Sequence, residues 1–503
     1  MELSKAGMVD GPDSSPFTLD ERMARLKDYV SAWEAPQLHD PETIKVREPC
    51  IWNMTGGLLS YATFGTGNDD GSATTTNLVF RKLASQTRCI EGRVWSYDVP
   101  GKVYLMETDL YQDLLILVTM DPITEVRCAV MHISFHQLST GETHRNAKHP
   151  VITQEVGYEA VEPNQRFISL CRNYVAILCY EVINDDREPC DYVGSDEVHV
   201  SDSQFFIIDW ESGDLIWRIN DAIRSFTFIS ENLVLLALLS NSKDPPLSGV
   251  LAVVDFSNQH RASCCSVTSA LLLPILTTNA VAYEISVRSS PPPKALNQSA
   301  VISDHIPFGT DPESRLITVN LHVRRWTQFL FCIPLSTIQR SITMCGGAQE
   351  VNRLMDCVEQ GLPWESWGPQ ATQMISRVGL PGFCYAWGSR CTFALAGRVR
   401  RSRYVKFCDF NPLLVKEHLH SIQTTGEGKK SQMHINNPKI SDIGIFQGGD
   451  TTSLSYLESS ARLFEIGDLM FNEDNLLIIN RDSQEDDEDE DGDSRTFDIY
   501  QIS

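Results

Sequence analysis

The chain has 503 residues, 42% of them hydrophobic, which is enough apolar material for a large buried core. Its formal net charge of −24 argues against a general nucleic-acid binder, which must neutralise phosphates, and no apolar run of about 18 residues predicts a membrane span. The 14 cysteines form no Cys-x-x-Cys pair and the N-terminus has no secretory pattern, so we expect reduced thiols in a cytoplasmic or nuclear protein.

The N-terminal part of the sequence predicts one helix. Residues 1–17 are polar and contain Pro and Gly, so we expect them to be disordered. Thr18 and Glu21 form a capping-box pattern that starts an amphipathic linker helix over residues 18–36. Its apolar stripe consists of Tyr29 and four candidates for partner contact, Met23, Leu26, Val30 and Trp33. We expect the stripe to pack on the β-rich part of the chain or on a preceding domain, and partner binding is the alternative.

A β-hairpin pattern recurs along the rest of the chain. Residues 133–142 and 205–219 both combine an alternating apolar strand with a four-residue turn that contains Gly. Weaker copies of this pattern occupy three further segments, and Asp precedes the turn in three of the five copies. The weaker copies lie at residues 251–258, 329–337 and 405–412. Their spacing is uneven, which predicts inserts at residues 184–190, 289–293 and 344–370.

This repetition predicts an all-β fold. We expect a degenerate, WD-like β-propeller of about seven blades over residues 45–503, preceded by the one short α-helix. A run of sandwiches is the alternative. The last strand, residues 496–502, is expected to pair with residues 475–480, and the acid run between them predicts a flexible loop over residues 482–495 of the last blade.

Several short segments, taken together, resemble a known family. They lie at residues 22–26 with Tyr29 and Trp33, and at residues 82–85, 93–95, 112–117, 138–142, 209–213 and 409–412. In this combination the chain is similar, from about residue 20 onward, to the region after the F-box in F-box/β-propeller proteins expanded in mushroom-forming (basidiomycete) fungi. The resemblance implies an F-box that binds a Skp-type adaptor of a cullin ubiquitin ligase, and a ring that recruits substrates. Residues 1–20 contain no Leu-Pro-x-Glu phrase and no leucine-rich triplet, so we expect no adaptor binding unless an F-box is restored.

No motif with a catalytic mechanism is apparent. The sequence contains no Gly-x-Ser-x-Gly elbow, His-Glu-x-x-His motif, P-loop or zinc-type cluster, so we expect no catalytic residue, no cofactor and no metal. His132 and His136 share one face of a predicted strand, but a metal site needs further ligands. We interpret both histidines as neutral and solvent-facing.

One dense basic patch contains the remaining candidates for partner contact, which are Arg398, Arg400, Arg401 and Arg403. On a strand, alternation places the first two on one face and the last two on the other. Three interpretations remain open: a solvated edge, an intramolecular partner for the acid loop, and a contact for a peptide or for nuclear import.

Two classes of function remain. A monomeric, non-catalytic interaction scaffold, resembling the substrate-recruiting part of F-box proteins, would present its propeller loops to protein partners. A propeller enzyme of the glycosidase or lactonase type is the alternative, and its channel active site would need convergent carboxylates that a sequence does not reveal. Neither class involves nucleic acid or a membrane.

Overall fold

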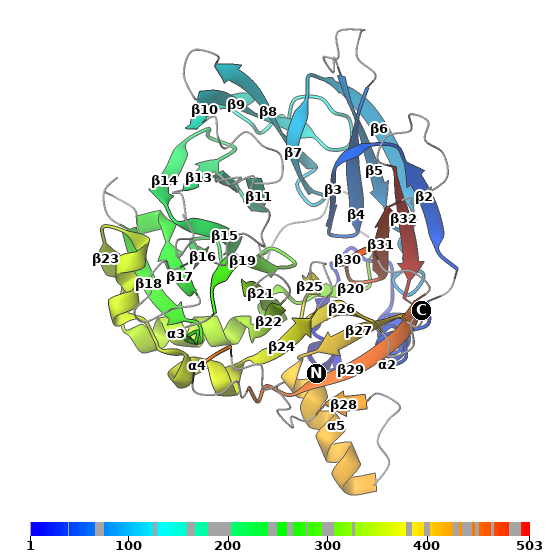
Figure 1. Cartoon of the computed structure of the whole chain (residues 1–503). Coiled ribbons are helices and arrows are strands. Elements are labelled where there is room, and N and C mark those ends of the chain that lie inside the picture. Colours follow the sequence, from blue (N-terminus) through cyan, green and yellow to red (C-terminus); the bar gives the residue numbers. More distant parts are fainter. Residues whose placement is uncertain are drawn as a thin grey trace, which may run out of the picture.

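The fold is a ring of seven antiparallel sheets (Figure 1). The computed structural model describes residues 2–38, 40–65, 75–123, 128–157, 166–179, 203–239, 249–258, 265–277, 280–293, 306–323, 327–378, 385–396, 403–425, 432–434, 445–447, 452–463, 467–481 and 494–502. Each sheet has four or five strands, so the predicted all-β, seven-bladed propeller is confirmed. No helix in these ranges is long and apolar enough to cross a membrane.

The first three blades follow one another as four-stranded meanders. Blade 1 contains β3 (Pro49–Thr55), β4 (Leu58–Phe64), β5 (Thr75–Lys82) and β6 (Arg93–Pro100). Blade 2 contains β7 (Val103–Asp109), β8 (Leu114–Ile123), β9 (Cys128–Gln137) and β10 (Val151–Gly157). Blade 3 contains β11 (Arg166–Cys171), β12 (Tyr174–Cys179), β13 (Ser203–Asp209) and β14 (Leu215–Asp221). The first strands of neighbouring blades contact each other, so they line the centre of the ring.

Blades 4 to 6 carry additional elements. Blade 4 contains β15 (Ile223–Phe228), β16 (Leu233–Leu238), β17 (Val250–Asp255) and β18 (Cys265–Leu272). Blade 5 contains β19 (Ala282–Ser289), β21 (Leu316–Val323), β22 (Thr327–Pro334) and β24 (Gln373–Val378). Blade 6 contains β25 (Tyr385–Trp387), β26 (Arg390–Ala396), β27 (Arg403–Asp409) and β29 (Tyr456–Leu463). Two short strands extend the outer edges of blades 4 and 6, namely β23 (Gln349–Val351) on β18 and β28 (Gln432–His434) on β29.

Blade 7 closes the ring with strands from both ends of the chain. It contains β30 (Asp468–Phe471), β31 (Asn475–Arg481), β32 (Arg495–Gln501) and, at its outer edge, β2 (Glu42–Val46). The predicted pairing of the last strand with residues 475–480 is confirmed. The contribution of β2 was not predicted, and it places the start of the propeller before residue 45. The predicted acid loop joins β31 to β32, but residues 482–493 lie outside the described part of the chain.

The recurring hairpin pattern marks the end of the third strand in blades 2 to 6. In blade 3, Asp209 Oδ1 accepts hydrogen bonds from the backbone N–H groups of Glu211 and Ser212, at 2.9 and 3.1 Å. Gly213 completes this turn with a φ of +82°, which side chains with a Cβ rarely allow. Asp255 and Asp409 bond to the backbone two residues ahead in the same way, which explains why Asp recurs at this position.

In blades 5 and 6 the prediction of a simple turn is wrong, because helices follow the third strands. These helices are α3 (Leu335–Cys345) and α5 (Pro412–Thr425). Leu335 and Ile338 of α3 are buried, so a helical apolar period overrides the turn signal. The predicted insert at 344–370 is present but begins earlier, at α3. It continues through β23, the 3₁₀ helix η6 (Leu354–Gln360) and α4 (Trp364–Ala371).

The other two predicted inserts, residues 184–190 and 289–293, form no additional helix or strand among the described residues. Residues 184–190 lie outside the described part of the chain, and residues 290–293 follow the end of β19. Two further 3₁₀ helices connect elements of the ring, η4 (Phe256–Asn258) after β17 and η5 (Pro312–Ser314) before β21.

The prediction of a disordered N-terminus is wrong for residues 2–17. They contain α1 (Glu2–Lys5) and β1 (Met8–Asp10), and β1 pairs antiparallel with β20 (Phe308–Thr310). Met8 is only 4% exposed, so this segment buries apolar surface that its polar composition obscured. The predicted linker helix is confirmed as α2 (Leu19–Glu34), and the capping box of Thr18 and Glu21 is present.

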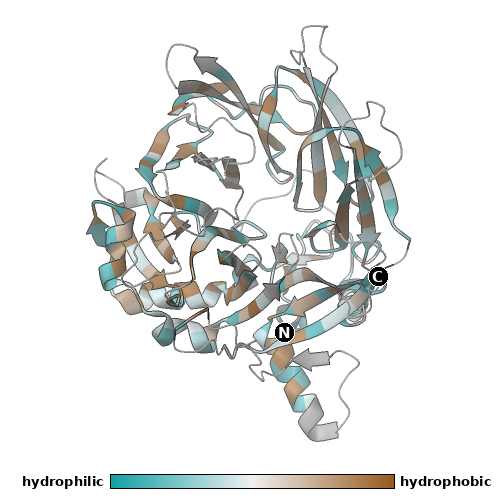
Figure 2. Ribbon diagram, in the orientation of Figure 1, coloured by the Kyte–Doolittle hydropathy of each residue, from teal (hydrophilic) through white to brown (hydrophobic). Residues whose placement is uncertain are grey.

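The core lies in the seams between blades. Hydrophobic residues concentrate on the blade strands, where Figure 2 shows them in brown. One seam, between blades 2 and 3, encloses the fully buried Trp210, whose ring lies 6.1 Å from that of Phe135. Each blade therefore depends on its neighbours for burial, so the complete ring forms one cooperative unit.

Candidate functional site

The apolar stripe of α2 packs on the ring. Leu26 and Trp33 are buried at 3% and 7% exposure, and Met23 and Val30 pack against the same cluster. Trp33 makes edge-on ring contacts with Phe407 of blade 6 at 5.4 Å, and with blade 7. The prediction that this helix docks on the propeller is confirmed. The four candidate partner residues on α2 are thus covered by the chain itself, which argues against the alternative of a free partner-binding helix.

A buried polar network fastens α2 to blades 6 and 7. The Tyr29 hydroxyl donates to the backbone carbonyl of Glu473 at 3.0 Å and accepts from Arg390 Nη1 at 2.7 Å. Arg390 Nε in turn donates to Asp409 Oδ2 at 2.8 Å. The Arg390 guanidinium also lies 4.5 Å from the centre of the Trp33 ring, a cation–π contact.

The network continues into blade 1 and toward blade 5. Arg88, in the connection between β5 and β6, is 4% exposed and forms an ion pair with Glu473 at 2.6 Å. It also forms a two-pronged contact with Asp474, in which Nε lies 3.0 Å from Oδ1. Glu473 Oε1 accepts a hydrogen bond from the backbone N–H of Thr310, in β20. Buried, paired charges from blades 1, 6 and 7 therefore meet the Tyr29 hydroxyl of α2 and the backbone of β20 at one place.

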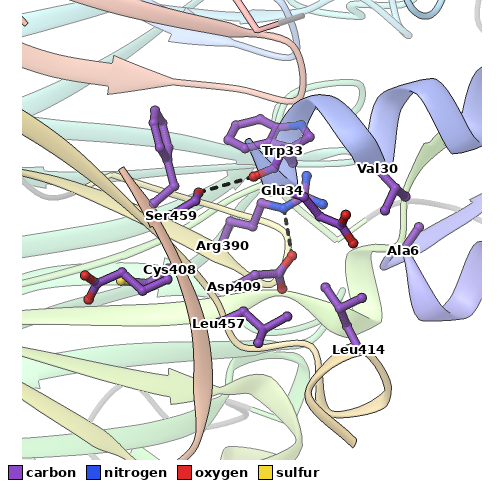
Figure 3. A pocket seen from close by; sticks show the side chains of 12 residues that line it. Ala6, Val30, Trp33, Glu34, Arg390, Cys408, Asp409, Leu414, Leu457 and Ser459 are labelled. Atoms are coloured by element: carbon purple, nitrogen blue, oxygen red, sulfur yellow. Dashed lines mark hydrogen bonds and ion pairs between the residues drawn. The ribbon is translucent and has the colours of Figure 1, made fainter. Parts of the chain in front are cut away.

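A small pocket lies beside this network (Figure 3). It is lined by Ala6, which follows α1, and by residues of α2, α5 and blade 6, and holds about 40 Å³ of free space. Its aliphatic walls come from Ala6, Val30, Leu414 and Leu457, whereas Arg390 and Asp409 lie at the polar side. This space fits a few water molecules or the tip of one side chain.

A second buried polar group lies between the innermost strands of blades 1 and 2. Glu107 of β7 is 9% exposed, and its Oε1 accepts hydrogen bonds from Thr55 Oγ1 at 3.3 Å and Asn53 Nδ2 at 3.4 Å. Burial raises the pKa of the Glu107 carboxyl from its ordinary value of 4.5 to about 7, and these hydrogen bonds oppose the rise.

The raised pKa of Glu107 makes stability depend on pH. Between pH 4.5 and about 7 the folded state binds more protons than the unfolded state, so this carboxyl makes stability fall as pH rises. We expect Glu107→Gln to be more stable than the parent chain by about 1–3 kcal/mol at about pH 8, and equally stable at about pH 4. Urea unfolding at both pH values measures this difference. An equal effect at both pH values would show that packing, not ionisation, is responsible.

The two predicted histidines have separate partners. His132 Nε2 lies 2.9 Å from Asp121 Oδ2, whereas His136 hydrogen-bonds to Ser134 Oγ and to the Gly141 carbonyl. Among the residues described, no group of three or more His, Cys, Asp or Glu side chains is arranged to hold a metal ion. His136 is half-buried, which differs from the expected solvent exposure.

The predicted basic patch is mostly outside the described residues. This applies to Arg398, Arg400 and Arg401, whereas Arg403 begins β27. The pairing of the basic patch with the acid loop, which was one of three interpretations, therefore stays a prediction. Of that predicted loop, residues 494–495 are described, and Arg495 already belongs to β32.

Sequence reasoning missed the buried network. Arg390 and Asp409 pair on neighbouring strands of blade 6, whereas Arg88 and Asp474 are 386 positions apart and meet only in the closed ring. One signal was available, since Arg390 directly precedes the apolar run of β26, where a charge is rarely buried without a partner.

Comparisons with known proteins give structural neighbours only. No family model matches this chain, and no curated protein matches it. The WD40 domain of SCAP from fission yeast is 7% identical, with a TM-score of 0.38 over 92% of this chain and 98% of that domain. The Synechocystis apocarotenoid oxygenase is 9% identical, with a TM-score of 0.30 over 67% of this chain and 65% of the oxygenase. A Listeria monocytogenes protein, lmo1340, is 9% identical, with a TM-score of 0.28 over 59% of this chain and 78% of that protein.

Proposed function

We propose that this chain is a non-catalytic protein-interaction scaffold that resembles the substrate-recruiting part of F-box proteins of a cullin ubiquitin ligase. The observation that carries the proposal is the pocket between α1, α2, α5 and blade 6. Its free space of about 40 Å³ accepts the tip of one side chain, whereas sites for small-molecule substrates usually measure about 300–1,000 Å³. The aliphatic walls of the pocket suit an apolar side chain of a protein partner.

Buried polar contacts hold the inner side of this pocket in place. The Arg390 ion pair and the Trp33 ring form its inner side, and both are fixed by the network that holds α2 on the ring. A pre-organised pocket loses little conformational entropy on binding, which favours specific recognition.

A charge in the pocket wall should remove the partner. We expect Leu414→Asp to capture at least about tenfold less partner protein from a lysate than the parent chain does. The reason is that binding of the partner would remove the new carboxylate from water. Leu215→Asp is the matched control, since Leu215 is 45% exposed on β14 of blade 3. Quantitative mass spectrometry compares the three captures, and thermal unfolding verifies that both variants fold. Equal capture by Leu414→Asp and the parent would place the partner elsewhere.

The link to a ubiquitin ligase has its own test. We expect the chain as given not to bind a Skp-type adaptor, because F-box binding buries a leucine-rich helical surface and the stripe of α2 is already covered. Calorimetry with purified adaptor should show no heat of binding, whereas fusion of an F-box before Thr18 should create binding. Micromolar binding by the unfused chain, abolished by Leu26→Asp, would show that α2 leaves the ring. Failure of the fusion to bind would refute the ligase connection.

One observation favours the second candidate, a channel enzyme of the glycosidase or lactonase type. Glu107 is a buried carboxyl on the innermost strand of blade 2 with a pKa of about 7, a value that suits a general acid at neutral pH. This candidate requires that purified protein hydrolyse a member of a glycoside or lactone panel, and that Glu107→Gln abolish that hydrolysis.

A further inference from the structure

Two cysteines from different blades are in contact. The Sγ atoms of Cys332, on β22 of blade 5, and Cys391, on β26 of blade 6, lie 3.7 Å apart. Both side chains are fully buried in the apolar cluster that fills the seam between these blades. This contact joins residues that are 59 positions apart in the sequence.

The geometry is close to that of a disulfide. A disulfide bond requires an Sγ–Sγ distance of about 2.05 Å, so the two sulfur atoms would have to approach by less than about 2 Å. Rotation about the Cα–Cβ bonds moves both sulfur atoms, and the two side chains already belong to one buried cluster. Cys408 of β27 is the cross-strand neighbour of Cys391 and is the competing thiol.

We propose that Cys332 and Cys391 form a redox modification site, in which a disulfide staples blade 5 to blade 6. The oxidant is a small disulfide such as glutathione disulfide. One cysteine, as its thiolate, attacks the oxidant to give a mixed disulfide and releases one glutathione thiolate. The second cysteine then attacks the protein sulfur of that mixed disulfide and displaces the second glutathione. The two protein thiols lose two protons and two electrons, and the oxidant becomes two molecules of glutathione.

Burial determines when this reaction takes place. A fully buried thiol is out of reach of glutathione disulfide, so the reagent reacts only when the seam opens or before it forms. Oxidation is therefore slow on the folded chain and fast during refolding. Once formed, the disulfide closes a long loop and reduces the conformational entropy of the unfolded state. This should raise the midpoint of thermal unfolding by about 5 °C.

Refolding in a glutathione redox buffer tests this site on the full chain. Reduced, denatured protein is first refolded with glutathione and glutathione disulfide. It is then unfolded in denaturant that contains an alkylating reagent, so that the remaining buried thiols are blocked, and digested without reductant. Mass spectrometry should show a linked peptide pair that contains Cys332 and Cys391, lighter than the reduced peptides by two hydrogen atoms. Cys332→Ala should lose both this pair and the rise in the unfolding midpoint. Cys171→Ala is the matched control, because Cys171 is also buried but lies in blade 3, and it should keep both.

The competing outcomes are distinct. A linked pair of Cys391 with Cys408 would overturn the proposed inter-blade site. Alkylation of both Cys332 and Cys391 after refolding would also overturn it, and would identify the contact as a simple S–H···S hydrogen bond. The result of this disulfide experiment is independent of whether the chain is an interaction scaffold, because that proposal is tested separately with Leu414→Asp.

Discussion

Deletion of residues 496–503 should abolish cooperative unfolding of this chain or make it insoluble. The deletion removes all but the first residue of β32, which lies between β31 and β2, so both neighbouring strands lose their pairing partner. It also removes Phe497, which is fully buried and stacks on Tyr61 of blade 1 at 5.7 Å. The seam between blades 7 and 1 would then be open, and its apolar surface would face water.

A graded series separates ring closure from simple truncation. Phe497→Ala keeps the strand but removes the ring contact, and should cost about 3–5 kcal/mol in the free energy of unfolding. Thr43→Ala removes only the exposed hydrogen bond to Asp498, at 2.7 Å, and should cost at most about 1 kcal/mol. Calorimetry and urea unfolding measure the series. A soluble deletion variant with a single sharp transition would contradict the closure by β32.

Arg88→Met should destabilise the chain by about 3–5 kcal/mol, because it leaves the buried carboxylates of Glu473 and Asp474 without their cation. The side chains of Arg88 and Asp474 are 5% and 6% exposed, so water does not replace the lost partner. The loss of stability is large because the two buried carboxylates must either stay charged without a cation or take up protons, and both cost free energy. Urea unfolding at neutral pH gives this value.

Two further variants test whether the loss of stability comes from the buried ion pair of Arg88 and Asp474. Arg218→Met is the matched control, since Arg218 is exposed on β14, and it should change stability by less than about 0.5 kcal/mol. Arg88→Met combined with Asp474→Leu should recover part of the loss, because one of the uncompensated charges is also removed. A double variant less stable than the sum of the single variants would show that the ion pair is not the source.

The strands were predictable because their signal is local. An alternating apolar run followed by Asp and Gly defines a strand and its turn within about ten residues, as at β13 and Gly213. The contribution of β2 could not be predicted in the same way. Its five residues, Glu-Thr-Ile-Lys-Val, are mostly exposed and contain only two apolar side chains, Ile44 and Val46, which is too short an alternation to identify a strand without the pairing with β32.

The candidate site was less predictable than the fold. The apolar stripe of α2 indicated that this helix packs on something, and the ring covers it as expected. The sequence did not predict the polar contacts of this helix with the ring. Tyr29 fits the apolar stripe, but its hydroxyl also forms hydrogen bonds to blades 6 and 7. Contacts between residues more than 300 positions apart leave no trace in local sequence patterns, so the pocket beside Arg390 also required the structure.

The pairing of β2 with β32 also determines when the protein can finish folding during its synthesis. Glu42 pairs with Ile499, so β2 leaves the ribosome long before its partner strand β32 does. At about 5–20 residues per second, β2 waits about 20–90 s for β32. During that time the nascent chain exposes an unpaired strand edge and the open side of blade 1, which are the surfaces that chaperones bind and that neighbouring chains on a polysome can capture.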